Sequence, residues 1–322
     1  MAFDQVNVVD ESEGERVRAD LVRARSARSI AEGSIRVLLM AAAAISIATT
    51  TAIVVILVRE SLSFFSQVPL AQYLFGTKWT PLLAGDQQSF GVLPLLWGTF
   101  YLTGIGLLLA IPCGLLSAIY LAEFARPKVR NTVKPILELL AGMPTIIFGY
   151  FALTFITPKI LRGLFGVEVL QYNGLAAGLT LGLLVIPTIA SVAEDAMRSV
   201  PHSLREGAFG LGASRLQVAL RVVFPAALSG VVAALILGAS RAVGETVIIL
   251  IAGGQQPSLS LDPRISFQSM ASFIAATARG DIPQGTLKYE TIFVVGFTLF
   301  IVTLLLNAVS SRLVRRYRQV YE

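Results

Sequence analysis

Six apolar segments, each long enough to cross a lipid bilayer, limit what this chain can fold into. A transmembrane helix needs about 20 predominantly apolar residues. Only 14% of the 322 residues are charged, against about 25% in a soluble globular domain. The sequence therefore predicts an all-α, multi-pass membrane protein with six transmembrane helices. The segments run over residues 37–58, 92–121, 135–156, 175–193, 225–252 and 292–310.

Glycine and proline interrupt three of these segments. In the second segment they predict a tilted or kinked helix that packs closely against its neighbours. In the third and fourth they predict close helix contacts or a lined cavity, because backbone groups freed by a break need partners inside the membrane. The breakers are Gly98, Gly104, Gly106, Pro112 and Gly114 in the second segment, Gly142, Pro144 and Gly149 in the third, and Pro187 in the fourth.

Basic residues cluster at the ends of apolar segments, not on one shared surface, so we do not expect nucleic acid as a partner. Six spans place the most basic connections on one side, which the positive-inside rule identifies as cytoplasmic, together with both termini. Residues 1–34 lack the apolar core and cleavage site of a signal peptide, so they read as a disordered or loosely helical tail. The basic positions are Arg126, Lys128, Arg130, Lys134, Arg198, Arg205, Arg215, Arg221, Arg312, Arg315, Arg316 and Arg318.

The long outer loop of residues 253–290 contains a second helical pattern. Phe267, Met270, Ala271 and Ile274 follow helical spacing and predict a short amphipathic helix. That helix either covers its own bundle or offers a docking surface to an external partner.

The connection between the fourth and fifth spans is polar and punctuated by glycine. Ser203 and Glu206 have the spacing of a capping box, and Ser214 and Gln217 repeat it. Gly212 allows the backbone to turn between them. We therefore expect two short helices joined by a glycine corner, not a flexible linker.

Two opposite charges fall deep within the fifth apolar segment. Arg241 lies about 20 Å along the helix from Leu228, at 1.5 Å per residue, where an unpaired charge is costly. Glu245 follows four residues later, which places both side chains on one face of a continuous helix. One interpretation is a self-compensating ion pair. The other is an anion site, where the guanidinium donates two parallel hydrogen bonds to an oxyanion and Glu245 accepts one from a protonated anion. Thr145 is a further candidate for such a path.

The loop between the fourth and fifth spans resembles the cytoplasmic signature of ABC importer permeases. The matching positions are Glu206-Gly207-Ala208, Gly212, Val222 and Phe224-Pro225, in the order and spacing of that signature. The resemblance implies that Glu206, Gly207, Ala208, Gly212 and Pro225 couple the chain to a separate ATP-hydrolysing subunit. Pro225 also suits the first turn of the fifth span.

Three further stretches are similar to the membrane subunits of the phosphate ABC importer, and the likeness as a whole covers most of residues 90–320. They are Leu139–Gly149, Ser240–Thr246 and Phe273–Pro283, and the run Tyr120–Pro127 favours the first of the two membrane subunits. The resemblance implies the type I ABC importer permease fold, with Arg241 and Glu245 as the charged pair on the phosphate path. It also implies a prokaryotic plasma (inner) membrane location, a second homologous membrane subunit, two ATP-binding subunits, an external phosphate-binding protein and contact with membrane lipid.

We accordingly expect four regions. They are a cytoplasmic tail (1–34), the first transmembrane helix with an outer loop (35–91), the permease domain with coupling helices near 201–223 (92–311), and a basic cytoplasmic tail (312–322).

The chain lacks the glycine-rich Gly-x-x-x-x-Gly-Lys-Ser/Thr loop that cradles nucleotide phosphates, so we expect it to be a transport subunit and not an enzyme. ATP and Mg are expected in the partner, and no cofactor or metal in this chain. His202, the lone histidine, has no companion ligands. The alternatives are an importer of molybdate or sulfate, an ion-coupled carrier in which Arg241 and Glu245 relay protons, and a membrane enzyme, which lacks any catalytic constellation.

Overall fold

The computed structural model describes residues 11–83 and 85–317, and these residues form helices joined by loops, without a β-strand among them. The chain divides into two units, Met1–Ile56 and Leu57–Glu322. The predicted tails lie partly outside the description, which omits residues 1–10 and 318–322, Arg318 included. From Glu11 onward the predicted N-terminal tail is helical, because α1 runs from Glu11 to Gln67.

Within the described residues, five helices are long and apolar enough to cross a membrane, or six if one bent pair forms a single span, which agrees with the predicted all-α membrane fold. They are residues 32–67 of α1; α3 (Leu93–Ile119) with the π-helical η2 (Tyr120–Phe124); α5 (Thr145–Phe151) with η3 (Ala152–Leu164); α6 (Gly174–Arg198); and α12 (Leu287–Tyr317). The bent pair joins residues 215–226 to α10 (Leu228–Val243) at 74°.

The third and fifth predicted spans had wrong boundaries. The helix expected over residues 135–156 is two helices, because α4 (Pro127–Ala141) ends at Gly142 and α5 begins only after Pro144. A residue before proline is disfavoured in the helical region, which makes this a natural break. The fifth span likewise ends at Gly244, and a helical turn resumes at Val247 and continues into η5 (Ile249–Gly253).

The centre of the bundle is the contact between α3 and α6, which pack along much of their length. A Cβ on Gly182 would lie 2.7 Å from the carbonyl oxygen of Gly106, so these two backbones approach too closely for a side chain. Small residues that allow such contact are typical of helix interfaces in membranes. The predicted close packing of the second span is confirmed.

Aromatic side chains hold together the end of the bundle that carries α2 (Leu70–Phe75) and α11 (Met270–Ala278). Trp79 and Phe273 form a T-shaped pair with ring centroids 5.0 Å apart. Met270 and Phe273 are buried, and α11 packs against α3 and α12. The predicted short helix in the long outer loop is therefore confirmed, and it covers its own bundle.

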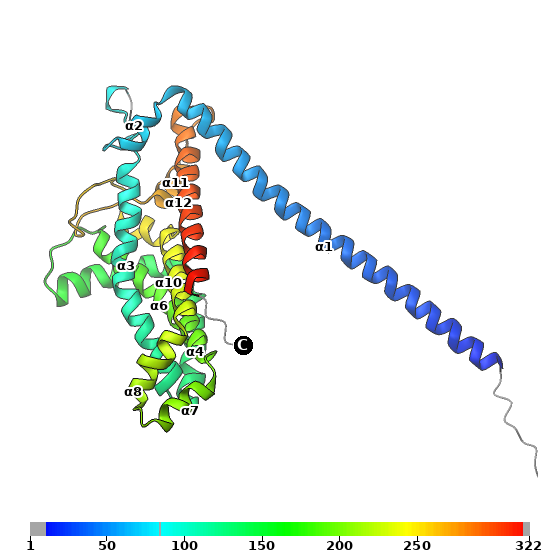
Figure 1. Ribbon diagram of the computed structural model, residues 1–322. Helices are drawn as coiled ribbons and strands as arrows, with labels where there is room; N and C mark the ends of the chain where they lie inside the picture. The colour runs from blue at the N-terminus through cyan, green and yellow to red at the C-terminus, as the bar shows by residue number, and fades with distance from the viewer. Residues whose placement is uncertain (1–10, 84, 318–322) are drawn as a thin grey trace, which may run out of the picture. The chain divides into compact units, whose positions relative to one another are not determined.

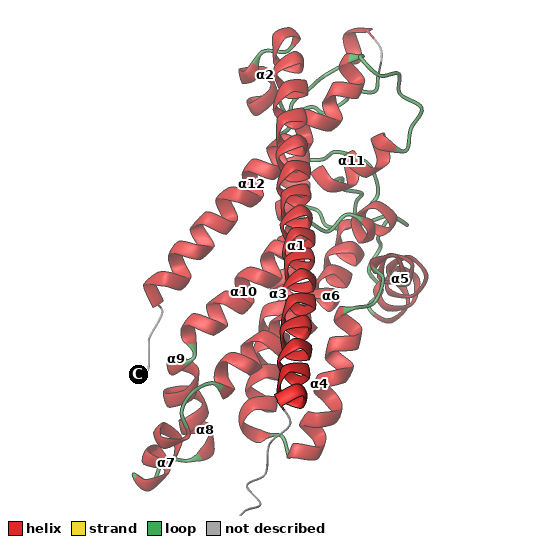
Figure 2. Cartoon of the chain, turned by 90° about the vertical axis from the view of Figure 1, so that its right-hand side faces the viewer, coloured by secondary structure: helices red, strands yellow, loops and turns green. Residues whose placement is uncertain are grey.

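Two short helices, α7 (His202–Gly210) and α8 (Arg215–Val218), lie at the opposite end of the second unit from α2 (Figures 1 and 2). The predicted pair of helices with a corner between them is thus present. α8 continues through η4 (Ala219–Val223) and α9 (Phe224–Ala226) to the bend that begins α10.

Candidate functional site

Arg241 links three helices through hydrogen bonds inside the bundle. It lies in the last turn of α10, and its Nη1 donates to Thr188 Oγ1 of α6 at 3.0 Å. Its Nη2 donates to the carbonyl oxygen of Ala141 at 2.8 Å, and Ala141 is the last residue of α4. The guanidinium therefore stands where the break after α4 and the break after α10 come together.

The helix ends around Arg241 favour a positive charge. The last carbonyls of a helix lack intrahelical partners and carry a partial negative charge. Arg241 satisfies one such carbonyl of α4 and lies at the carbonyl end of α10 itself. These interactions offset part of the cost of placing a guanidinium within a membrane-spanning bundle.

Most of the hydrogen-bonding capacity of Arg241 remains available. A guanidinium has five N–H donors in a planar fork. Two of them bond to Thr188 and Ala141, and the other three have no partner in the described part of the chain. The side chain is half-buried, so these donors can reach a small solute.

Glu245 occupies the break that follows α10. Its Oε1 accepts hydrogen bonds from the backbone N–H groups of Val247 at 2.9 Å and Ile248 at 3.1 Å. The carboxylate thus caps the start of the resumed helical turn, where a negative charge is favoured. Oε2 accepts no hydrogen bond from any described residue, and it is not among the fully buried, unpartnered atoms.

The structure contradicts the idea of a self-compensating ion pair. Among the described residues no salt bridge joins Arg241 to Glu245. Because α10 ends at Val243, the two residues do not follow one continuous helix, and the spacing of four places them on either side of a break. The Arg241 guanidinium bonds to neighbouring helices instead.

Thr145 is the first residue of α5, directly after the break that begins beyond Ala141. α5 packs against η5, and a Cβ on Gly149 would lie 3.1 Å from Ile251 and 3.4 Å from the Cα of Ile248. The two helical segments that leave the Arg241 site therefore run against each other. Thr154, by contrast, bonds to the carbonyl of Tyr150 in its own helix, at 2.8 Å.

The residues predicted to contact the ATP-hydrolysing subunit lie in and after the short helix pair α7 and α8, and most of them are exposed. Glu206, Gly207 and Gly212 are exposed, Ala208 is half-buried, and Pro225 is exposed in α9. Gly212 has φ +79°, which few other residues adopt at low cost.

Only one of the two predicted capping boxes is present. Ser214 and Gln217 form a capping box at the start of α8. The box predicted for Ser203 and Glu206 is wrong, because α7 begins after Pro201 and Ser203 already lies inside the helix.

Arg205 fixes α7 to the bundle. Its side chain is buried, and its Nη2 donates to Glu123 Oε1 of η2 at 3.0 Å. It also donates to the carbonyls of Met197 at 2.8 Å and Val200 at 2.5 Å. Sequence reasoning counted Arg205 only as a positive loop charge, and its position next to Glu206 was the one available signal of this role.

A second buried ion cluster joins α4 to α6. Glu194 is fully buried, and it accepts hydrogen bonds from Arg130 at 2.7 Å and Lys134 at 2.8 Å. The hydrogen bond to Glu194 raises the pKa of Arg130. Burial by itself lowers the pKa of Lys134, but hydrogen bonds to Asp195 and Glu194 outweigh it and raise that pKa. Arg130 and Lys134 thereby hold α4 against the C-terminal end of α6, which is also where Arg205 holds α7.

Residues 110–319 match the family of binding-protein-dependent transport system inner membrane components. The chain belongs to this family. It is 31% identical over 311 residues to the probable ABC transporter permease protein YqgH of Bacillus subtilis, covering 95% of this chain and 99% of the relative. It is 33% identical to the phosphate transport system permease protein PstC 1 of Mycobacterium tuberculosis, covering 70% of this chain and 73% of that protein.

Solved structures of the inward-facing MetNI methionine ABC transporter share the fold. They superpose with a TM-score of 0.52 at 23% identity, covering 71% of this chain and 95% of theirs. A bacterial transporter that imports the acidic polysaccharide alginate gives 0.55 at 17% identity, covering 80% of this chain and 93% of its own. The predicted type I ABC importer permease fold is confirmed, and the chain is an ABC importer permease with several membrane-spanning helices.

The anchoring of α7 in this permease yields a prediction. Replacing Arg205 with alanine removes the buried bonds to Glu123 and to two carbonyls, so α7 should open more readily. Hydrogen exchange of the purified protein, followed by mass spectrometry, should become at least tenfold faster across residues 202–211. Arg215→Ala changes an exposed side chain and serves as the control. Unchanged exchange in Arg205→Ala would contradict the anchoring role.

Proposed function

We propose that this permease is a subunit of an ATP-driven importer of inorganic phosphate. It would form half of the path, with a second homologous membrane subunit as the other half. Two ATP-binding subunits would drive transport with ATP and Mg, and an external phosphate-binding protein would deliver the solute. The proposal places the chain in the prokaryotic plasma (inner) membrane, with both termini and the α7–α8 pair on the cytoplasmic side.

One observation carries the choice of an anionic solute. Three N–H donors of Arg241 have no partner among the described residues, although this guanidinium lies at the meeting point of two helix breaks. Arginine binds oxyanions through two parallel charge-assisted hydrogen bonds. Ala141 and Thr188 hold the guanidinium in place, so its free donors are pre-oriented for such a ligand.

Glu245 supports phosphate over a fully ionised oxyanion. Its Oε1 is occupied by the backbone of the resumed helix, whereas its Oε2 has no partner in the described part of the chain. A free carboxylate oxygen can accept a hydrogen bond from the P–OH group of hydrogen phosphate. Sulfate and molybdate have no such proton at neutral pH and would meet only repulsion. The relatives named phosphate transport system permease proteins point to the same solute.

The coupling route follows from the chain itself. Exposed Glu206, Gly207 and Gly212 would dock on the ATPase, with Ala208 beside them, and Arg205 would transfer the motion of α7 to the bundle. From Pro225 the chain bends by 74° into α10. α10 then carries Arg241 about 20 Å away, at 1.5 Å per residue. A tilt imposed at the helix pair would therefore move the solute site directly. An ion-coupled carrier would have no use for such an exposed pair.

The direct test is uptake of labelled phosphate by proteoliposomes that contain the complete assembly. Uptake should require ATP and the external binding protein. Arg241→Ala should reduce it about 10- to 100-fold, the worth of one hydrogen bond to a charged group, while the ATPase subunits still co-purify. Arg279→Ala alters an exposed arginine of the α11–α12 loop and should have no effect. Uptake without ATP, or a preference for sulfate or molybdate, would contradict the proposal.

A second test addresses the selectivity assigned to Glu245. In Glu245→Gln the amide oxygen can still cap Val247 and Ile248, but an N–H₂ donor replaces the free acceptor. The preference for phosphate over sulfate should fall at least tenfold in competition uptake assays. Asp281→Asn, an exposed carboxylate in a loop, is the matched control. An unchanged preference in Glu245→Gln would reject the role of this carboxylate.

A further inference from the structure

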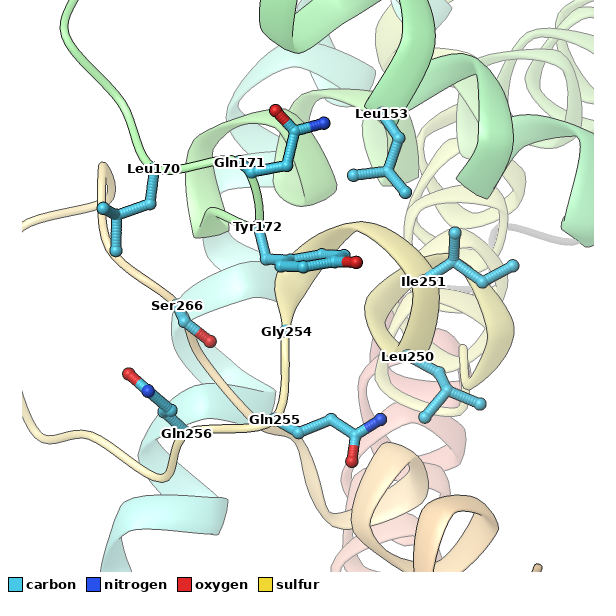
Figure 3. A pocket seen from close by; sticks show the side chains of 10 residues that line it. All are labelled: Leu153, Leu170, Gln171, Tyr172, Leu250, Ile251, Gly254, Gln255, Gln256 and Ser266. Atoms are coloured by element: carbon cyan, nitrogen blue, oxygen red, sulfur yellow. The ribbon is translucent and has the colours of Figure 1, made fainter.

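A second cavity, with a volume of about 740 Å³, lies away from Arg241 and has a different chemistry. Figure 3 shows its polar side chains arranged around the turn at Gly254. Cavities of this size are typical of small-molecule sites. The lining residues come from η3, from the loop before α6, from η5 and from the loop after it: Leu153, Leu170, Gln171, Tyr172, Leu250, Ile251, Gly254, Gln255, Gln256 and Ser266.

The polar side chains that line this cavity are uncharged, and all of them except Ser266 are exposed. Gln171, Gln255 and Gln256 contribute amides, and Tyr172 and Ser266 contribute hydroxyls. None of the five side chains has a hydrogen-bond partner in the described part of the chain. The described residues that line the cavity include no Asp, Glu, Lys, Arg or His. Amides and hydroxyls can both donate and accept. The cavity therefore offers many hydrogen bonds without a fixed charge.

The floor of the cavity is rigid and shaped by the backbone. Gly254 has φ +87°, and a Cβ there would lie 2.0 Å from the Oγ of Ser266. Any side chain at position 254 would displace the Ser266 hydroxyl, so this position requires glycine. Ser266 is 7% exposed, and its Oγ is not among the fully buried atoms without a partner, so this hydroxyl faces the cavity and can be reached from solvent. Backbone hydrogen bonds tie the surrounding loops together, from Phe267 N to Gly253 O at 2.8 Å and from Asn173 N to Ala252 O at 2.9 Å.

Two helical segments begin at the Arg241 site and extend to the lining of the cavity. One begins at Val247, where Glu245 caps it, and contributes Leu250 and Ile251 to the lining. The other begins at Thr145 and contributes Leu153. From Val247 to Gly253 the backbone rises about 9 Å, at 1.5 Å per residue. The same two segments therefore border both the cavity and the Arg241 site.

We propose that this cavity is an entry site that holds hydrogen phosphate before it reaches Arg241; the inference rests on the proposed function. Hydrogen phosphate both accepts and donates hydrogen bonds, which suits side chains that do the same. Neutral side chains lack the charge of a guanidinium, so the cavity would hold the anion less strongly than Arg241 does. Passage through a membrane protein requires binding that is favourable enough for entry and weak enough for exit. The charged site then takes the anion onward.

The test measures protection of a cysteine in the cavity by inorganic phosphate. Cys113 is first replaced with serine, and Leu170→Cys, which removes no polar group of the cavity, becomes the reporter for a neutral maleimide. In the complete assembly, phosphate should slow the labelling, whereas chloride at equal ionic strength should not. Adding Gln255→Leu should raise the half-protecting phosphate concentration at least tenfold, because one hydrogen bond to a charged group is lost.

Matched variants keep the outcome decisive. Gln284→Leu changes an exposed glutamine outside the cavity and should leave protection unaltered, and Leu153→Cys is a second reporter from another segment. Arg241→Ala should reduce uptake as predicted above yet retain protection, because the entry site precedes the guanidinium. Protection by a neutral sugar and not by phosphate, or equal protection with and without Gln255, would overturn the inference. Absence of phosphate uptake by the unmodified assembly would instead refute the proposed function.

Discussion

The hydrogen bonds of Arg241 to Ala141 and Thr188 are the constraint on which the proposed solute site depends. They join the ends of α4 and α10 to the middle of α6, where backbone groups would otherwise lack partners inside a membrane. The same bonds leave the remaining donors of the guanidinium at fixed positions. The helix breaks therefore have two effects. They stabilise the positive charge of Arg241, and they leave its free donors open to the proposed solute.

Two buried ion clusters give the opposite end of the bundle its stiffness. Glu123 with Arg205 holds α7, and Glu194 with Arg130 and Lys134 holds α4. Removing one partner of a buried pair commonly costs about 3–5 kcal/mol, so these contacts resist deformation. Motion of α7 would consequently reach η2 and the end of α6 through the bonds of Arg205.

Much of the fold could be predicted from the sequence, because the length of the apolar segments determines the number of spans. The paired short helices and α11 followed from glycine, cap and periodicity patterns. The break at Gly244 was missed, and the breakers Gly142 and Pro144 were recognised but still placed inside one span, since apolar residues continue on both sides. Arg241 and Glu245 could be singled out by their depth, but their partners are distant in sequence. Glu194 gave no signal, because a carboxylate near the end of a span usually faces water.

The most direct measurement is an electron cryomicroscopy map of the complete assembly, stalled with a hydrolysis-deficient ATPase subunit in the presence of phosphate. The account predicts tetrahedral density about 2.8 Å from the free nitrogens of Arg241, with the bonds to Ala141 and Thr188 retained. A guanidinium that is paired with Glu245, or phosphate density remote from Arg241 in every state that encloses the anion, would contradict it.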